Sequence, residues 1–259
     1  MSPPEFSLDR DNLAALAEGA IMTESTDADR VDQAIDALID GDLARAQSLL
    51  LAVIANTPDD YAFSYEKDGE LCIEFWTLPD FLHYATWDRD EEAEQQINWT
   101  PNAYPRAFYY MGFLCVKLQR YDMALAYLQR GMTLEPQNPK FLFESAQALF
   151  RMGRVDEAFE LYERVTDLSP FVTPADLATG LRGRGFILIE RGELDTAEAF
   201  FIKSLQLDPD SEVARNELDY IKHLRRGGDV APAAIVETQA GAKDLDEPLE
   251  EDPHKDYWN

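Results

Sequence analysis

The sequence predicts a mostly α-helical solenoid of stacked helical hairpins that carries a small β-containing insert. An amphipathic stretch occurs three times and ends each time in proline, at Pro136, Pro170 and Pro209. Between residues 59 and 102 the apolar residues instead alternate, which is typical of strands. The chain has 259 residues, 46 % of them hydrophobic, which is enough for one large domain or two small ones.

The repeated stretch follows a nearly constant period. Pro136 and Pro170 are 34 residues apart, and Pro209 follows after 39, which is one period with five extra residues. Each unit has a small residue 24 and another 12 positions before its proline, and a large apolar residue 8 positions before it. This spacing predicts two helices per unit that cross closely at the small residues. The three sets are Gly112, Ala124 and Leu128, then Ala146, Ala158 and Tyr162, then Gly185, Ala197 and Phe201.

This pattern resembles the tetratricopeptide repeat, a helix–turn–helix of 34 residues. The resemblance covers residues 105–209 and implies three units within residues 103–226, where the stretch SEVARNELDYIKHLRR indicates a capping helix. Two positions depart from the family's pattern, because Cys115 stands where an aromatic residue is usual and Arg184 where leucine is usual. The matching residues are Phe108, Met111, Gly112, Tyr121, Ala124, Leu128 and Pro136, then Leu142, Ala146, Leu149, Ala158, Tyr162 and Pro170, then Leu181, Gly185, Leu188, Ala197, Phe201 and Pro209.

A divergent unit precedes the insert. Residues 27–58 place Ala34, Ala46 and Pro58 at the same offsets, so they are expected to form a further helical hairpin after an N-terminal extension over 1–26. The insert, residues 59–102, is expected to hold a β-hairpin with its turn near Gly69, a short helix and a third strand at INW. It is rich in aromatic residues. These either form a private core of the insert or a ridge that binds a partner.

Charge divides the chain. The net charge is −27, but residues 103–226 hold 18 acidic and 16 basic residues, so the excess lies at the two ends. Such a polyanion disfavours nucleic acid as a partner. The tail over 227–259, with 9 acidic and 2 basic residues, is expected to be disordered. Its Tyr257 and Trp258 are either part of a solvated end or a docking motif, which would act within the chain or by self-association.

The remaining composition points away from catalysis and membranes. No stretch is long and apolar enough to predict a membrane span, and the start lacks the features of a secretory signal. Cys72 and Cys115 suggest no disulfide framework or thiolate zinc site, so we expect a cytoplasmic protein in a reducing compartment. None of the three histidines lies in a metal or nucleophile motif. We expect no catalytic residues, no metal and no cofactor.

The resemblance implies a binding groove. In tetratricopeptide proteins the first helix of each unit lines a concave face that receives a peptide or a partner helix. The two-carboxylate clamp of heat-shock cochaperones requires Lys and Asn at the positions that Tyr109 and Phe113 occupy here. The C-terminus of a chaperone is therefore not a favoured ligand of the groove. For Phe113, Phe143 and Phe186 the alternative is packing against the next helix. The implied groove residues are Arg106, Tyr109, Phe113, Lys117, Lys140, Phe143, Gln147, Arg151, Arg182, Phe186 and Glu190.

Three classes of function compete at this point. The first is an adaptor or chaperone-like scaffold that binds a protein or peptide partner in the groove. The second is an acidic inhibitor or immunity-type protein, in which residues 1–102 block a basic partner by charge. The third is an accessory subunit of an enzyme complex. The three basic groove residues Arg106, Lys140 and Arg182 are expected to be exposed and available to a partner.

Overall fold

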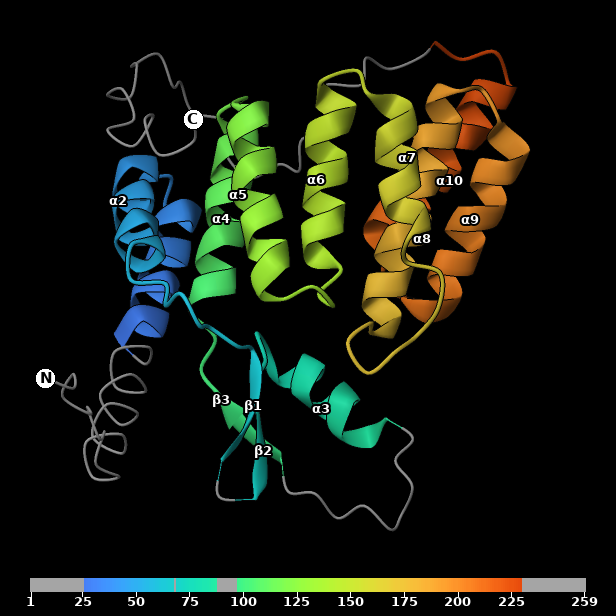
Figure 1. The fold of residues 1–259 in the computed structure, drawn as a ribbon. Helices are drawn as coiled ribbons and strands as arrows, with labels where there is room; N and C mark the ends of the chain where they lie inside the picture. Colours follow the sequence, from blue (N-terminus) through green and yellow to red (C-terminus); the bar gives the residue numbers. More distant parts are fainter. Residues whose placement is uncertain (1–25, 68, 88–96, 230–259) are drawn as a thin grey trace, which may run out of the picture.

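The computed structural model describes residues 26–67, 69–87 and 97–229, which form a row of helical hairpins with a small sheet beside one end of the helices (Figure 1). This confirms the predicted fold class. The expected extension over 1–26 and tail over 227–259 lie almost entirely outside these residues.

Four helical hairpins, the insert and a final helix follow one another within the described residues. The hairpins are residues 26–39 with α2 (Leu43–Ile54), α4 (Tyr104–Lys117) with α5 (Tyr121–Leu134), α6 (Lys140–Arg151) with α7 (Val155–Glu163), and α8 (Pro174–Glu190) with α9 (Leu194–Leu207). The insert contains β1 (Ser64–Lys67), β2 (Glu70–Glu74), α3 (Leu78–Thr86) and β3 (Ile97–Thr100). The final helix, α10 (Glu212–Arg225), covers the last hairpin with Ala214 and Ile221.

The small residues lie where the helices of each hairpin cross. Ala124, Ala158 and Ala197 are fully buried. A Cβ atom at Gly112 would lie 2.5 Å from Cγ of Leu128 in the partner helix, closer than any real contact, so only glycine fits there. The small residue and the large apolar residue of the repeat are therefore the two sides of one contact.

The five extra residues of the third unit lengthen one helix. α8 has 17 residues and α6 has 12. Both helices end five positions after their small residue, at Glu190 after Gly185 and at Arg151 after Ala146. The added length thus lies at the start of α8, which extends toward the insert.

The first helices of the three C-terminal hairpins form an inner layer. α4 contacts α6 and α6 contacts α8, whereas among the described residues α5, α7 and α9 make no comparable contact with one another. Ring contacts bridge the layer: Tyr109 meets Phe141 at 5.9 Å between centroids, and Phe150 meets Phe186 at 5.2 Å. The inner layer, α4 with α6 and α8, is the face that the resemblance assigns to binding.

The insert folds as expected into a hairpin, a helix and a third strand. β1 pairs with β2 antiparallel, with Ser64 opposite Ile73. β3 pairs with β2 in parallel, with Leu71 opposite Ile97. The parallel pairing follows from the path of the chain, because a strand that returns after a helical crossover can run in the same direction as its neighbour.

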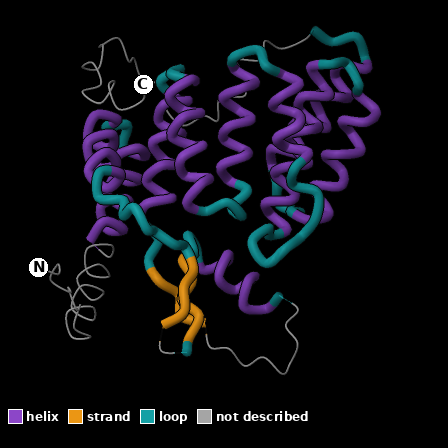
Figure 2. The backbone as a smooth tube through the Cα atoms, in the orientation of Figure 1, coloured by secondary structure: helices purple, strands orange, loops and turns teal. Residues whose placement is uncertain are grey.

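The insert packs along the turns that join one hairpin to the next (Figure 2). Phe63 and Tyr84 contact Phe171, which precedes α8, at 5.9 and 5.0 Å between ring centroids. His83 Nε2 lies 2.8 Å from the carbonyl oxygen of Ser169 in the same loop. Aromatic residues of the insert therefore pack partly on one another, as Phe75 does on Phe81, and partly on the solenoid, so their core is shared with the solenoid and is not the private core that was expected. Leu78, Leu82 and Trp99 remain exposed.

Candidate functional site

The expected groove residues all lie on the three helices of the inner layer, and they divide into two groups. The insert-side half comprises residues toward the helix starts, where the insert packs: Arg106, Tyr109, Lys140, Phe143 and Arg182. The open half comprises residues toward the helix ends: Phe113, Lys117, Gln147, Arg151, Phe186 and Glu190. The two groups have different surroundings.

An aromatic box on the insert-side half holds Trp76 of the insert. The Trp76 ring lies 5.1 Å from Tyr109, 5.8 Å from Phe141 and 6.4 Å from Tyr110, measured between centroids. Tyr109 and Phe141 meet it edge to face, the arrangement that aromatic rings prefer. Burial raises the pKa of the Tyr109 hydroxyl well above its usual value. The chain thus fills this part of its own groove with a tryptophan.

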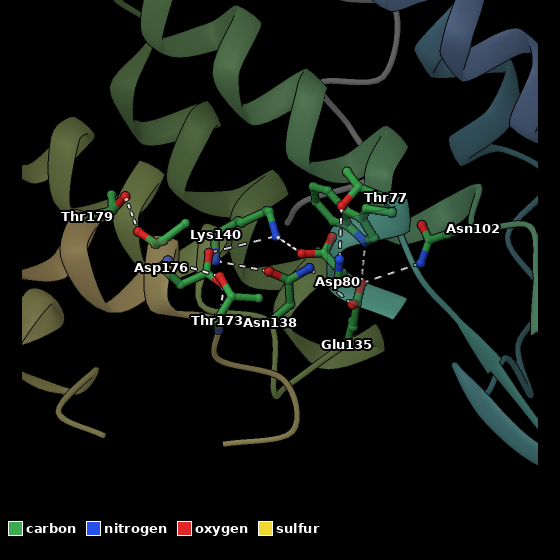
Figure 3. A network of polar contacts seen from close by, with 11 residues as sticks. Thr77, Asp80, Asn102, Glu135, Asn138, Lys140, Thr173, Asp176 and Thr179 are labelled. Carbon is green, nitrogen blue, oxygen red and sulfur yellow. Dashed lines mark hydrogen bonds and ion pairs between the residues drawn. The ribbon is translucent and has the colours of Figure 1, made fainter. Parts of the chain in front are cut away.

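Lys140 is the charged centre of the same half (Figure 3). Its Nζ lies 3.4 Å from Asp80 Oδ1 of the insert and 3.8 Å from Asp176 Oδ1 of α8. The ammonium group also lies 5.5 Å from the centre of the Trp76 ring. Asp176 belongs to the capping box of α8, where it exchanges hydrogen bonds with Thr173. Lys140 therefore joins three parts of the molecule that are far apart in the sequence.

Glu135 lies beneath Trp76 and is buried among donors. Trp76 Nε1 donates to its carboxylate at 2.7 Å, Asn138 Nδ2 at 3.1 Å and Asn102 Nδ2 at 3.5 Å. Burial raises its pKa to about 7, and the hydrogen bonds counteract part of that rise. The junction around Trp76 and Glu135 leaves a cavity of only about 20 Å³, roughly the space of one water molecule. This half is a closed, internally satisfied junction.

The expectation that Arg106, Lys140 and Arg182 are exposed is wrong. Arg106 forms an ion pair with Asp32 of the first hairpin, and Arg182 Nη1 lies 2.8 Å from Asp208 Oδ2 after α9. Their side chains are only 14 % and 18 % exposed, and that of Lys140 is 27 % exposed. The physical reason is that the fold brings carboxylates from distant parts of the chain beside these three cations: Asp32 beside Arg106, Asp80 and Asp176 beside Lys140, and Asp208 beside Arg182.

Two further residues on α6 are buried rather than available to a partner. Phe143 is 7 % exposed and stacks on Tyr162 at 6.0 Å between centroids, so packing was the correct alternative for it. Glu144 is 4 % exposed, and burial raises its pKa to about 7. Burial, and after it the charge of Glu144, raises the pKa of the Tyr109 and Tyr162 hydroxyls.

The open half keeps its side chains accessible. Phe113 is 37 % exposed, and Lys117, Gln147, Arg151 and Glu190 are also exposed. Among the described residues no carboxylate lies within ion-pair distance of Lys117 or Arg151. Phe186 is partly buried and contacts Phe150 of α6 within the same inner layer, which does not decide whether its ring faces the groove.

Four residues of the open half form a strip on two of its three helices, α4 and α6. Phe113 and Lys117 are four residues apart on α4, and Gln147 and Arg151 are four residues apart on α6, so each pair shares one helix face. The two pairs occupy equivalent repeat positions, 34 residues apart. The strip therefore presents an aromatic ring and a cation on one face of α4, and a second cation at the equivalent position of α6.

Sequence reasoning missed the residues that close the insert-side half: Trp76, Asn102, Glu135 and Asn138. Their partners lie up to 59 positions away in the sequence, and each polar residue is ordinary for a loop. Glu135 directly precedes a repeat proline, and an acidic or polar residue stands at that position in the other units too. This position therefore gave only a weak sequence signal for the junction. Among the described residues no group of histidine, cysteine and acidic side chains is placed to hold a metal ion, and no helix is long and apolar enough to cross a membrane.

Comparison with known proteins identifies the repeats. Family models described as tetratricopeptide repeat match residues 116–174 and 183–211. A curated relative, human protein O-mannosyl-transferase TMTC1, is 28 % identical over 114 residues, which are 42 % of this chain and 12 % of that protein. The probable assembly chaperone of rpl4 from Emericella nidulans is 28 % identical over 81 residues, 31 % of this chain and 21 % of that protein. The chain thus spans about a fifth or less of these relatives.

A solved structure of another protein supports the fold. A structure reported with the functional characterization of Pseudomonas aeruginosa pilF superposes with a TM-score of 0.54 at 12 % identity, over 79 % of this chain and 72 % of that one. The first TPR of Spaghetti (RPAP3), bound to an HSP90 peptide, superposes with a TM-score of 0.41 at 23 % identity, over 47 % of this chain and 93 % of that one.

Proposed function

We propose that this tetratricopeptide repeat protein is a non-enzymatic adaptor that binds a segment of a partner protein on the open half of its inner layer. One observation carries the proposal: Lys117 and Arg151 are exposed beside Phe113 and have no carboxylate partner among the described residues. In the insert-side half of the same layer every cation is paired. Exposed cations without an ion pair in the described part of the chain also occur outside the inner layer, for example Arg130 and Lys203. The distinguishing feature of the strip is therefore that its two cations share the inner layer with an exposed aromatic ring.

The chemistry of the strip defines the partner. An exposed aromatic ring offers apolar contact area, and a guanidinium and an ammonium group favour carboxylates. The expected ligand is a short acidic segment with at least one large apolar side chain. Most of the affinity is expected to come from the ring and the arginine, because such residues dominate interface energies. A chaperone role is one form of this function, and the name of the Emericella nidulans relative is compatible with it.

A peptide selection tests the proposal. A random peptide library displayed on phage is selected against the full chain, and individual peptides are then titrated by fluorescence anisotropy. We expect acidic peptides with an aromatic residue. We expect Phe113→Ala together with Arg151→Glu to weaken them at least about tenfold, since each 1.4 kcal/mol corresponds to a factor of ten.

A matched control uses cations outside the layer. Arg130 of α5 and Lys203 of α9 are exposed and lie on second helices. Arg130→Glu or Lys203→Glu, each as a single change, alters the net charge by the same amount as Arg151→Glu in the strip and is expected to keep the selected peptides bound. Peptides that bind the strip variant and the wild type equally would refute the proposed site.

A further inference from the structure

The insert shows which ligand chemistry the inner layer accepts. Trp76 places its ring in an aromatic box of the layer, and Asp80, four residues later, pairs with Lys140 at 3.4 Å. An aromatic residue and a carboxylate close together in sequence are thus recognised by a ring and a cation of the inner helices. The open half offers the same two groups through Phe113, Lys117 and Arg151, and no described residue pairs with these cations.

One segment of the chain outside the described residues has the matching chemistry. Residues 244–252 contain six acidic residues, and Asp256 is followed directly by Tyr257 and Trp258. Carboxylates favour Lys117 and Arg151, and the two rings match Phe113. We infer that residues 244–258 bind the open half of the inner layer in the same molecule and compete there with the partner. This inference rests on the proposed function of that strip.

The last described residues, where the tail begins, lie near the helix ends that carry the open half. Leu224 and Gly228, near the end of the described chain, line a cavity of about 320 Å³ together with Ile189, Glu190, Gly192 and Leu194. The chain therefore leaves the described part beside the end of α8, where the open half begins. On the insert side it would have to pass the full length of the helices.

The tail is also long enough. Neighbouring packed helices lie about 8–10 Å apart, so the step from α8 across α6 to α4 is about 20 Å. Asp229 and Tyr257 are 28 positions apart, and an unstructured segment of that many residues would have a root-mean-square reach of about 30 Å. A tether of this length raises the effective concentration of its end to about the millimolar range. A segment that binds the open half only weakly as a separate molecule can therefore occupy it when both belong to the same chain.

A peptide titration tests the inference directly. The probe is a fluorescently labelled synthetic peptide of residues 243–259. It is titrated into the full chain and into a chain lacking these residues. We expect binding to the shortened chain, at least about tenfold weaker binding to the full chain, and loss of affinity as salt rises. Tyr257→Ala with Trp258→Ala in the full chain should restore most of the peptide binding.

Charge variants of the shortened chain locate the site. We expect Lys117→Glu with Arg151→Glu to abolish binding of the probe, and Arg130→Glu with Lys203→Glu to leave it nearly unchanged. Equal binding of the probe to the full and shortened chains would overturn the inference, as would binding that ignores Lys117 and Arg151. A dimer of the full chain that grows with concentration and disappears on deletion would overturn docking within one molecule and assign the tail to a second copy.

The outcomes separate this inference from the proposed function. If library peptides depend on Phe113 and Arg151 but the tail peptide does not bind, the strip is a partner site and the tail is not its ligand. If the tail peptide depends on the strip but library peptides do not, the strip is a site for the tail and the proposed partner function fails.

Discussion

The two halves of the inner layer contain similar residues, aromatic rings beside basic side chains, and differ in what lies against them. On the insert side, Trp76 fills the aromatic box and Lys140 has carboxylates at 3.4 and 3.8 Å. On the open side, Phe113 is 37 % exposed, and Lys117 and Arg151 have no described partner. The same kind of surface therefore stabilises the fold at one end and is available for binding at the other.

The difference shows how an insert can assign roles within a repeat protein. Each repeat presents equivalent positions, so the solenoid alone would offer one continuous strip. The insert packs against the turns before α6 and α8 and covers the inner layer only toward the helix starts, where Trp76 contacts α4 and α6 and Asp80 pairs with Lys140. Four predictions test this division, from the largest expected effect on stability to the smallest.

Reversal of the charge at Lys140 is expected to have the largest effect. Lys140→Glu would place a fourth carboxylate among Asp80, Asp176 and Glu135 and remove the cation that they share. Loss of one partner of a buried ion pair costs about 3–5 kcal/mol, and the partial exposure of Lys140 favours the lower end. Urea denaturation measures the change. The same reversal at Lys117 in the open half should stay within about 0.5 kcal/mol. Similar losses at both positions would contradict the division.

Truncation of the tryptophan in the box comes next. Trp76→Ala removes the ring that contacts Tyr109 and Phe141, and it also leaves Glu135 without its shortest hydrogen bond. Truncation of a largely packed tryptophan costs about 3 kcal/mol. Thermal and urea unfolding are the measurements, and tryptophan fluorescence is compared with the Trp99→Ala variant as control, because Trp99 is 42 % exposed. A stable Trp76→Ala protein with an unchanged melting temperature would show that the insert does not depend on the box.

The buried carboxyl of Glu144 predicts a pH dependence. Its pKa is about 7 in the folded protein and 4.5 ordinarily, so the folded state binds the proton more tightly. Below about pH 4.5 the carboxyl is protonated in both the folded and the unfolded state, and its full contribution to the free energy of unfolding is present. This contribution is lost as the pH rises through 7. Glu144→Gln should therefore be nearly neutral near pH 4.5 and stabilise the protein at pH 8 by about 1–3 kcal/mol, since one pKa unit corresponds to about 1.4 kcal/mol.

Unfolding curves at several pH values test the Glu144 prediction. The matched control is Glu190→Gln in the open half, where the side chain is exposed. A Glu144→Gln variant that is equally stable relative to wild type at pH 4.5 and pH 8 would show that the carboxyl is not buried in solution.

Truncation of the exposed ring in the open half should have the smallest effect on folding. Phe113→Ala removes a side chain with few packing partners, so the free energy of unfolding should fall by no more than about 1 kcal/mol. Its effect is expected in binding instead, as a loss of about tenfold for acidic aromatic peptides. Titration calorimetry and a thermal melt of the same sample separate the two quantities. A large loss of stability would place Phe113 in the core.

The sequence by itself determined the repeats. Gly112 opposite Leu128 and the buried Ala124, Ala158 and Ala197 follow from local periodicity, because a helix crossing is specified by residues of one hairpin. The hairpin of β1 and β2 was predictable for the same reason, since its turn and alternation lie within a few residues. The helices that carry the expected groove residues were also correctly placed.

Only the tertiary structure decided which groove residues are available. Arg106, Lys140 and Arg182 occupy the expected helices, yet each pairs with a carboxylate between 26 and 74 positions away. With 50 acidic residues in the chain, periodicity cannot say which of them will meet a given cation. Burial of Glu135 and Glu144 likewise depends on elements that pack over them from elsewhere. Helix crossings are local and could be read from spacing, whereas charge pairing and burial are set by how distant segments come together.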